Sequence, residues 1–594
     1  MSQKLEDLLN LALLTSEAVR RQTDTLNVGF VEETRSWELI VKYHGSLEVL
    51  ETLDIRIEYL IAGYAILTVP ENLVERVAEL SEIEYVEKPK RYYYSVSGPT
   101  DGFCFPLVTM REPYLRGRGT LIAVLDSGIA YQRSDFRKRN GDTRIRFLWD
   151  QTLVPDENMP DPAPPEGYAE GVEFTETQIN LALQASTEQE RFALVPSVDV
   201  SGHGTAVAGI AAGYPEDGSY MGAAPEADLL VVKLGLPGEA DFPRTTEIMR
   251  GVTYALQKAA ELQMPLAINL SFGNSYGSHD GSSLLERFLD NAAEIGRTVI
   301  CVGSGNEGRS GGHFAGNVEQ TRSVELAVAE YETTLNLQIW KNYNDVYDIR
   351  LRSPGGEEAE VTAPVGGGKY TLQLEQTQIL VYLGEPTPYS VAQEIYLDMI
   401  PARSENGPYI NSGVWTVLID PVRVVTGQYY LYLPAGAGRN SRTVFYRPTP
   451  EVSLTIPATA AKVITVGAYD DIYDSYADFS GRGYADAQRT LGVVTAGLVK
   501  PDLVAPGVDI LAPDVYGGYA SFTGTSFATP IVTGSAALLM EWGIVRGNDP
   551  YLYGEKVKAY LRAGARPLRG ETEYPNDRVG FGKLCVADSI PTGR

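Results

Sequence analysis

The pattern of apolar and polar positions changes several times along the chain. The first 30 residues carry leucines at helical spacing, which predicts a short amphipathic helix. Residues 37–90 then form short alternating runs separated by turn-forming residues, and Pro70 stands where a helix begins. The order strand, helix, strand, strand, helix, strand predicts a small N-terminal α+β domain of the split βαβ (ferredoxin-like) type.

From about residue 119 the apolar runs no longer alternate with polar residues. Unbroken apolar runs occupy residues 121–125, 229–233, 266–270 and 298–302. Helical patterns separate them, as at residues 246–262 and 283–295. Buried strands that alternate with helices predict an α/β domain, a parallel sheet with helices on both faces. The same pattern resumes near residue 461 and continues to the end.

The intervening residues 318–450 alternate again and predict only strands. Runs such as 335–339 and 370–374 have period two, and clusters of Gly and Pro separate them. This pattern is typical of a β-sandwich or jelly roll, here inserted into the α/β domain. The expected organisation is an N-terminal domain over residues 1–97, an α/β domain over 98–317 and 451–594, and an inserted β domain over 318–450.

Composition and charge narrow the possible functions. The 594 residues include 50 basic and 77 acidic ones, a net charge of −27, whereas binding to nucleic acid normally needs a basic face. No apolar run reaches the roughly 20 residues that a membrane span requires. Three cysteines argue against a disulfide framework. The first 21 residues are not typical of a secretory signal peptide, so we expect synthesis and retention inside the cell.

Two residues in the first half of the α/β pattern are candidates for chemistry. Asp126 directly follows the apolar run 121–125, at the sheet edge where open α/β folds place their sites. His203 lies between two glycines at the start of a helix built from very small residues. Taken alone, Asp126 is as readily a turn-forming residue, and a lone histidine is usually a core residue with satisfied hydrogen bonds.

Two more candidates lie further along the chain. Ser526 stands at the amino end of an apolar helix, where the helix dipole and free N–H groups favour a developing oxyanion. A plain N-cap is the alternative. Asn306 follows the run 298–302 and suits either a turn or an oxyanion donor. The order Asp, His, Ser is one of the known orders of a Ser-His-Asp triad.

Around these residues the sequence closely resembles the subtilisin family. The matching motifs are Ala-Val-Leu-Asp-Ser-Gly at 123–128, Gly-His-Gly-Thr at 202–205 and Gly-Thr-Ser-Phe-Ala-Thr-Pro at 524–530. The resemblance implies a serine endopeptidase with Asp126, His203 and Ser526 as its triad and Asn306 in the oxyanion hole. It also implies a set of substrate-binding residues, namely Ser271, Phe272 and Gly273 beside the extended peptide and Gly303, Ser304 and Gly305 at the floor of the pocket.

The same resemblance implies that residues 1–97 are a propeptide that the enzyme cuts from itself. The region expected to enter the active site and be cut comprises Tyr94, Ser95, Val96 and Ser97. The β insert and the long interval between Asp126 and His203 further resemble the Csp proteases of spore-forming clostridia. That resemblance implies a propeptide that stays bound, an insert that braces the fold, and packaging in the spore.

The Csp resemblance also implies a substrate. It is the zymogen of a spore cortex-lytic hydrolase, cut during germination. A general intracellular subtilisin is the first alternative. A latent protease-like scaffold or signalling receptor is the second.

No cofactor is expected for the reaction, and no residue is predicted as a metal ligand. The acidic stretch 470–474 has the oxygen ligands that calcium prefers, and many subtilisins bind calcium. A solvated acidic turn is the alternative for these residues. The expected partners are a protein or peptide substrate and the chain's own propeptide.

Overall fold

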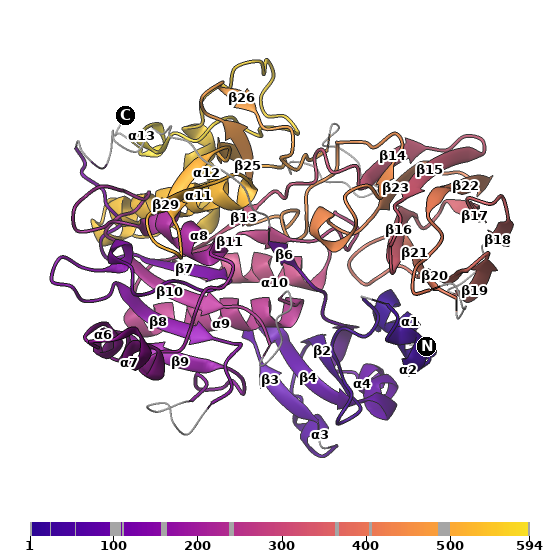
Figure 1. Cartoon of the computed structure of the whole chain (residues 1–594), viewed down its shortest axis with the longest axis horizontal. Helices are drawn as coiled ribbons and strands as arrows, with labels where there is room; N and C mark the ends of the chain where they lie inside the picture. The colour runs from indigo at the N-terminus through magenta and orange to yellow at the C-terminus, as the bar shows by residue number, and fades with distance from the viewer. Residues whose placement is uncertain are drawn as a thin grey trace.

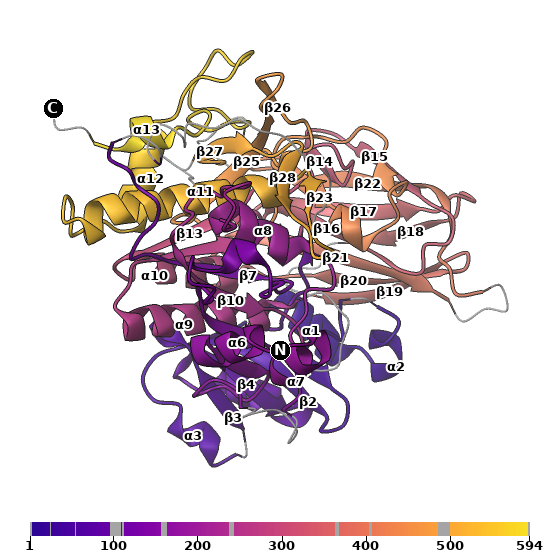
Figure 2. The same cartoon turned by 60° about the vertical axis from the view of Figure 1, so that its left-hand side comes forward.

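The chain folds into three units that pack against one another (Figure 1). The computed structural model describes residues 3–23, 25–53, 55–94, 109, 112–155, 163–236, 243–362, 368–402, 407–484 and 499–591. The N-terminal domain lies beneath the α/β domain in this view, and the β insert lies to one side of both. Figure 2 shows the same arrangement after a turn about the vertical axis.

The N-terminal domain is an antiparallel sheet with small helices. Its elements are α1 (Asp7–Leu14), α2 (Glu17–Arg20), β1 (Phe30–Val31), β2 (Ser36–Tyr43), α3 (Glu48–Glu51), β3 (Arg56–Tyr59), β4 (Tyr64–Pro70), α4 (Val74–Glu79) and β5 (Ile83–Glu87). The strand order is β1-β2-β4-β3, and β5 pairs with β2. Both faces of β2 are covered: Leu39 and Val41 pack with α1 and α4, whereas Ile40 packs against the α/β domain.

The α/β domain is built on a predominantly parallel sheet, as the sequence predicts. Its strands are β7 (Leu121–Asp126), β8 (Ile145–Asp150), β9 (Val172–Thr175), β10 (Asp228–Lys233), β11 (Leu266–Leu270), β13 (Thr298–Gly303), β25 (Ile464–Asp470), β26 (Ser475–Tyr476) and β27 (Leu503–Pro506). The order is β26-β25-β13-β11-β7-β10-β8-β9, and β27 pairs with β25. The sheet thus reunites the two parts of the domain that the insert separates in sequence.

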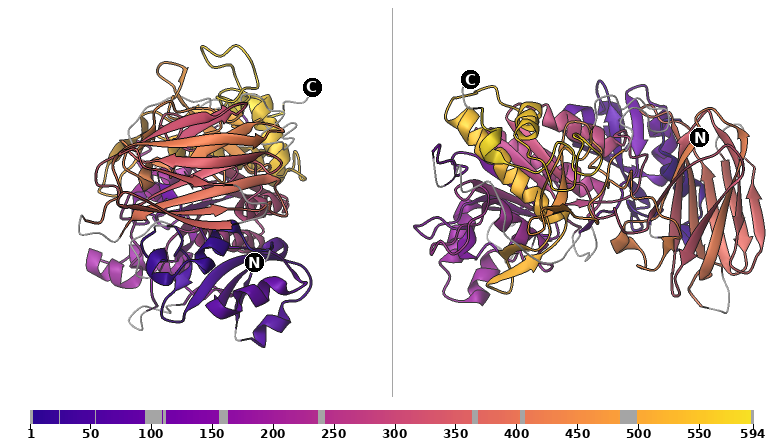
Figure 3. Two further views of the ribbon diagram at one scale, coloured as in Figure 1. Left: turned by 90° about the vertical axis from the view of Figure 1, so that its right-hand side faces the viewer. Right: turned by 90° about the horizontal axis from the view of Figure 1, so that it is seen from above.

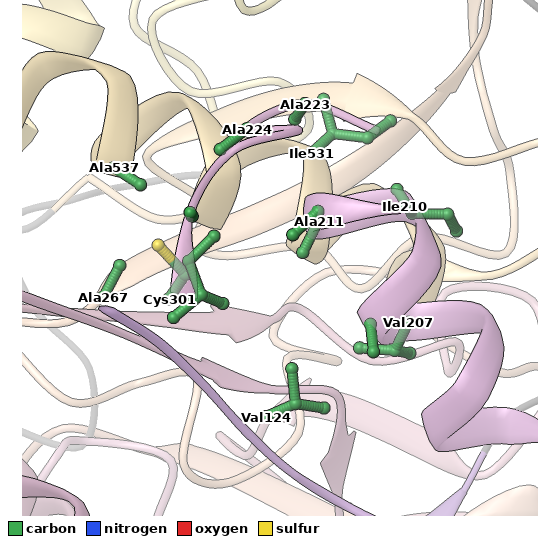
Figure 4. Close-up of a cluster of buried hydrophobic side chains, with 14 of the residues drawn as sticks. Val124, Val207, Ile210, Ala211, Ala223, Ala224, Ala267, Cys301, Ile531 and Ala537 are labelled. Carbon is green, nitrogen blue, oxygen red and sulfur yellow. The ribbon is translucent and has the colours of Figure 1, made fainter. Parts of the chain in front are cut away.

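Helices cover both faces of this sheet. The helices of the domain are α6 (Glu176–Leu183), α7 (Glu188–Leu194), α8 (His203–Ala212), α9 (Thr245–Leu262), α10 (Leu284–Ala293), α11 (Thr525–Met540), α12 (Gly554–Ala563) and α13 (Val586–Ser589). Val124 points toward α8 and α11, and its neighbour Leu125 points toward α9 and α10. Small side chains such as Ala211 and Ala223 bring α8 close to α11 (Figure 4).

The insert is a sandwich of two antiparallel sheets. Its strands are β14 (His313–Asn317), β15 (Arg322–Val328), β16 (Leu335–Asn342), β17 (Val346–Arg352), β18 (Glu358–Val361), β19 (Gly368–Leu374), β20 (Thr377–Leu383), β21 (Ala392–Pro401), β22 (Gly413–Arg423), β23 (Gln428–Tyr432) and β24 (Val444–Phe445). The orders are β14-β23-β16-β21-β20-β19 and β18-β17-β22-β15-β24. Figure 3 shows the insert from two further sides. The sandwich begins at His313, ahead of the expected residue 318, because β14 pairs with β23.

The insert also packs against the N-terminal domain, a contact that periodicity does not reveal. Leu8 and Leu9 of α1 share one apolar cluster with Leu380 and Tyr396 of the insert. The hydroxyl groups of Thr25 and Tyr396 are 2.6 Å apart. The predicted short helix is therefore α1, and its apolar side chains pack between the rest of the N-terminal domain and the insert.

Two observations modify expectations from composition. Among the described residues, the helical stretch Thr525–Val545 is long and apolar enough to cross a membrane, although no such run was expected. It consists of the core helix α11 and its extension, and 83% of its most apolar part is buried. Such burial is what the core helix of a soluble domain shows. Cys301 is buried and free, whereas Cys585 is disulfide-bonded.

Candidate active site

Asp126 and His203 meet at the carboxyl end of β7. His203 Nδ1 lies 2.7 Å from Asp126 Oδ1, and both side chains are fully buried. The backbone N–H of Ser127 donates to the same Oδ1 at 2.7 Å. Gly204 permits the contact, since a Cβ at this position would lie 2.2 Å from the carbonyl oxygen of Gly128. The Gly-His-Gly motif therefore brings the start of α8 against the turn after β7.

Ser526 is the second residue of α11, and reciprocal hydrogen bonds tie it to Ser271. Ser526 Oγ donates to the Ser271 carbonyl, and Ser271 Oγ donates to the Ser526 carbonyl, each at 2.9 Å. Asn269 Nδ2 donates to Ser271 Oγ at 2.8 Å and so orients it. The next residue, Phe527, places its ring 5.2 Å from the His203 ring. The amino end of α11 is thereby held beside both His203 and the strand after β11.

Asn306 lies after β13, and its amide oxygen faces α11. Asn306 Oδ1 accepts hydrogen bonds from both the backbone N–H and the hydroxyl of Thr525, each at 3.0 Å. An amide whose oxygen is engaged keeps its two N–H groups as donors. Asn306 and Ser526 line one pocket, so these donors belong to the same site as the Ser526 hydroxyl.

This pocket contains most of the predicted substrate-binding residues. They are Ser271, Phe272, Gly273, Gly303 and Gly305, which line it together with Ser526. Ser304 does not line it: its side chain is buried, with its hydroxyl 3.2 Å from Ser480 Oγ. Sequence reasoning missed four lining residues, namely Glu307, Ala435, Thr455 and Thr525. Glu307 adjoins a recognised motif, but Ala435 and Thr455 lie at the end of the insert and beyond it, where no motif marks them.

The end of the N-terminal domain enters the same site as a strand. β6 (Tyr93–Tyr94) pairs antiparallel with β12 (Phe272–Gly273), Tyr94 opposite Phe272. Upstream, the N–H of Tyr92 donates to the Pro243 carbonyl at 2.7 Å. Ser95, Val96 and Ser97, the rest of the expected cleavage region, lie outside the described residues. The tail therefore takes the strand position that the sequence analysis assigns to an extended substrate.

Buried charges join the N-terminal domain to α9. Glu38 contacts Arg244 at 2.8 Å and Arg250 at 2.6 Å, and Arg250 also contacts Glu58 at 2.9 Å. Burial alone would raise the pKa of Glu38, but the two guanidinium groups outweigh it and lower that pKa to about 2. Removing one of these groups would leave its partner as an unpaired buried charge, which strongly destabilises a protein.

The acidic stretch 470–474, for which the sequence leaves calcium binding and a solvated turn open, has internal partners for its carboxylates. Asp470 Oδ1 accepts the N–H groups of Ile472 and Tyr473, and Asp474 pairs with Lys583 at 2.6 Å. Among the described residues, no group of three or more His, Cys, Asp or Glu is arranged to hold a metal ion.

Comparison with known proteins establishes the class. The subtilase family model matches residues 117–381 and 435–582, and the Csp protease B prodomain model matches residues 3–90. The chain belongs to the subtilase family of subtilisin-like serine proteases, and it carries an N-terminal prodomain.

Individual relatives agree with this assignment. The solved structure of the Clostridium perfringens CspB protease is 33% identical, with a TM-score of 0.72, and the match covers 82% of this chain and 95% of that one. Minor extracellular protease Vpr of Bacillus subtilis is 25% identical over 552 residues, and serine protease AprX of Bacillus subtilis is 33% identical over 159 residues. These alignments cover 86% and 23% of this chain, but only 59% and 32% of the two relatives' own lengths.

Proposed function

We propose that the enzyme first cuts its own prodomain from the catalytic domain, with Asp126, His203 and Ser526 as the triad. The observation that carries this proposal is the pairing of β6 with β12. It presents the end of the prodomain as an extended strand beside the pocket that contains Ser526, because both residues of β12 line that pocket. A substrate strand added to an exposed sheet edge is a common mode of peptide recognition.

The chemistry follows from the position of each group. Ser526 Oγ turns from the Ser271 carbonyl, attacks the peptide carbonyl and loses its proton to His203. Asp126 accepts from Nδ1–H, which leaves Nε2 as the base and stabilises the imidazolium that forms. Asn306 Nδ2 and the Ser526 N–H stabilise the tetrahedral oxyanion. His203 then protonates the leaving amine, the C–N bond breaks, and water hydrolyses the acyl-enzyme by the same route.

The prodomain is proposed to remain bound after the cut. The ion pairs of Arg244 and Arg250 support this, and so does the apolar contact in which Tyr64 meets Phe288 of α10, with ring centroids 5.5 Å apart. Glu87 also accepts the N–H of Leu284 at the start of α10. A product strand held by a folded domain blocks the cleft until the domain is removed.

For the substrate in trans we propose the zymogen of a spore cortex-lytic hydrolase, activated by limited proteolysis during germination. This follows from the resemblance to clostridial Csp proteases, and the proposal includes an enzyme made inside the cell and packaged in the spore. A general intracellular protease would instead degrade many loosely structured proteins. A latent scaffold would cut neither its own chain nor a partner.

Two assays separate these functions. Denaturing gels and intact masses of the purified chain should show two fragments divided near residue 97, and Ser526→Ala should give one folded, uncut chain. Identical fragments from Ser526→Ala would refute the triad assignment. Incubation with a cortex-hydrolase zymogen or with casein then identifies the substrate class, because discrete cutting of the zymogen supports activation and broad casein turnover supports general proteolysis.

A further inference from the structure

Thr455 fills the space between two glycine-containing segments of the active-site pocket. A Cβ placed on Gly273 would lie 2.3 Å from Thr455 Oγ1, and one on Gly305 would lie 2.5 Å from both Oγ1 and Cγ2 of Thr455. Both glycines line the pocket of Ser526 and Asn306. The side chain of Thr455 therefore occupies the slot between the segment after β11 and the segment after β13.

The backbone around Thr455 holds it in that slot. Its N–H donates to the Ser304 carbonyl at 3.0 Å, beside Gly305. The following residue, Ile456, exchanges hydrogen bonds with Asn274, beside Gly273, at 2.8 and 3.1 Å. Thr455 is 4% exposed. Anchored to both walls, it has little freedom to withdraw when a ligand enters.

The hydroxyl of Thr455 is available to such a ligand. Oγ1 is buried and has no hydrogen-bond partner within the described parts of the chain. A buried polar atom without a partner is costly, so a ligand that supplies one gains affinity. The pocket thus offers a narrow space with a buried, unpaired hydroxyl in its lining.

We propose that Thr455 restricts the residue before the cut bond to a small side chain, with serine favoured over alanine because its hydroxyl pairs with Thr455 Oγ1. This inference rests on the proposed function. A pocket that lacks room for one methylene already discriminates about 10- to 200-fold, and an aromatic side chain exceeds that limit by far. The sequence after β6 agrees, because the bulky Tyr92, Tyr93 and Tyr94 give way to Ser-Val-Ser-Gly at residues 95–98.

The β insert contributes to the same pocket. Ala435 lines it, and the short helical turn Gly436–Gly438 packs against β6. The N–H of Gly436 donates to Glu307 Oε1 at 3.0 Å, which connects the insert to the segment of Asn306. The insert and the residues that follow it therefore narrow the substrate pocket as well as bracing the fold.

Self-cleavage of the full chain provides the test. Intact masses of the two fragments identify the residue before the cut, which is then replaced by Phe. In the native background this change should slow cutting at that bond at least about tenfold. Adding Thr455→Gly should restore cutting of the Phe-containing chain. Thr455→Val, which keeps the volume and removes the hydroxyl, should retain the exclusion of Phe and lose the advantage of Ser over Ala.

Thr459→Ala is the matched control. Thr459 is also a buried threonine of this segment, but it does not line the pocket and donates to Glu286. Thr459→Ala should leave the preference for the residue before the cut unchanged.

Thr455→Ser, a smaller change, provides the comparison if Thr455→Gly does not fold. The inference would be overturned if the chain with Thr455 cut after Phe at close to the parental rate. It would also be overturned if a folded Thr455→Gly chain cut after the parental residue but not after Phe. Absence of any Ser526-dependent cutting would instead refute the proposed function.

Discussion

Arg250 on α9 of the catalytic domain and Glu38 on β2 of the prodomain form a buried ion pair, with Arg250 Nη2 2.6 Å from Glu38 Oε1. Each residue is 6% exposed. Arg250 also reaches Glu58 on β3, so one guanidinium group joins two strands of the prodomain sheet to the catalytic domain. The proposed retention of the cut prodomain would thus depend on charges that form pairs only while the two domains are in contact.

Arg250→Met should weaken that contact. It leaves Glu58 without this partner and Glu38 with Arg244 alone, and breaking a buried pair costs about 3–5 kcal/mol. After self-cleavage, size-exclusion chromatography at physiological salt should separate the two fragments of the variant, whereas those of the native protein should co-elute. Arg309→Met removes an exposed pair with Asp478 and serves as the control, because such pairs contribute about 0–1 kcal/mol. Co-elution of the Arg250→Met fragments would contradict the assigned role.

Asn306→Ala should slow self-cleavage without abolishing it. Loss of one oxyanion donor typically reduces the rate by about 10²–10³. The rate is measured from the time course of fragment formation in freshly translated chain. Asn317→Ala, at an exposed position on β14, should cut at the native rate. A native rate for Asn306→Ala would exclude Asn306 from the oxyanion hole, and complete inactivity would assign it a larger role than that of a supporting donor.

Leu380→Ala should destabilise the prodomain although it lies in the insert. Leu380 is 2% exposed and packs in the same cluster as Leu8 and Leu9 of α1. A buried Leu→Ala change typically costs about 2–5 kcal/mol. Limited proteolysis should therefore digest the prodomain faster, and the melting temperature should fall. Val422→Ala, at a site 62% exposed, tests for a general effect of the insert and should change neither. Unchanged digestion of the prodomain in Leu380→Ala would show that the insert does not brace it.

The stability of the junction between prodomain and insert should fall as pH rises from about 4 to about 8. Burial raises the pKa of Asp7 to about 8, and the N–H of Glu385 offsets this only in part. Charged and titratable groups surround Asp7 in the same cavity, namely Glu6, Tyr85, Glu87, Lys90 and Glu394. A carboxyl whose folded pKa exceeds its unfolded value stabilises the fold below the unfolded value, and this contribution disappears as pH rises through the folded one.

Asp7→Asn tests this dependence. Urea unfolding at about pH 5.5 and about pH 8.5 should show a smaller loss of stability for the variant than for the native chain. Asp217→Asn is the control: hydrogen bonds from Ser219 lower the pKa of this exposed carboxyl, so it stays ionised across the range. If the free energy of unfolding fell equally between the two pH values in Asp7→Asn and in the native protein, the pH dependence would belong to other groups.

The motifs of the catalytic domain were readable from sequence because their requirements are local. Gly204 lets α8 approach the turn after β7, and Ser526 needs only the amino end of an apolar helix. Each constraint fixes the residue types at a few neighbouring positions, even where the partner is distant, so it appears as a short motif. The alternation of periods likewise predicted the three domains, because a strand or helix shows its buried face in its own sequence.

Tertiary structure alone decided how distant segments share a surface. Thr455 enters the pocket only because the chain returns from a long insert to pair with residues beside Gly273 and Gly305. Ser304 was misplaced because adjacent residues of an extended segment face opposite ways, and which way is set by the neighbouring Ser480. Two further contacts join surfaces more than a hundred residues apart in sequence. They are the packing of α1 against the insert and the Glu38–Arg250 ion pair. Periodicity marks a face as buried, but the identity of what covers it depends on the packing of whole domains, which local spacing does not encode.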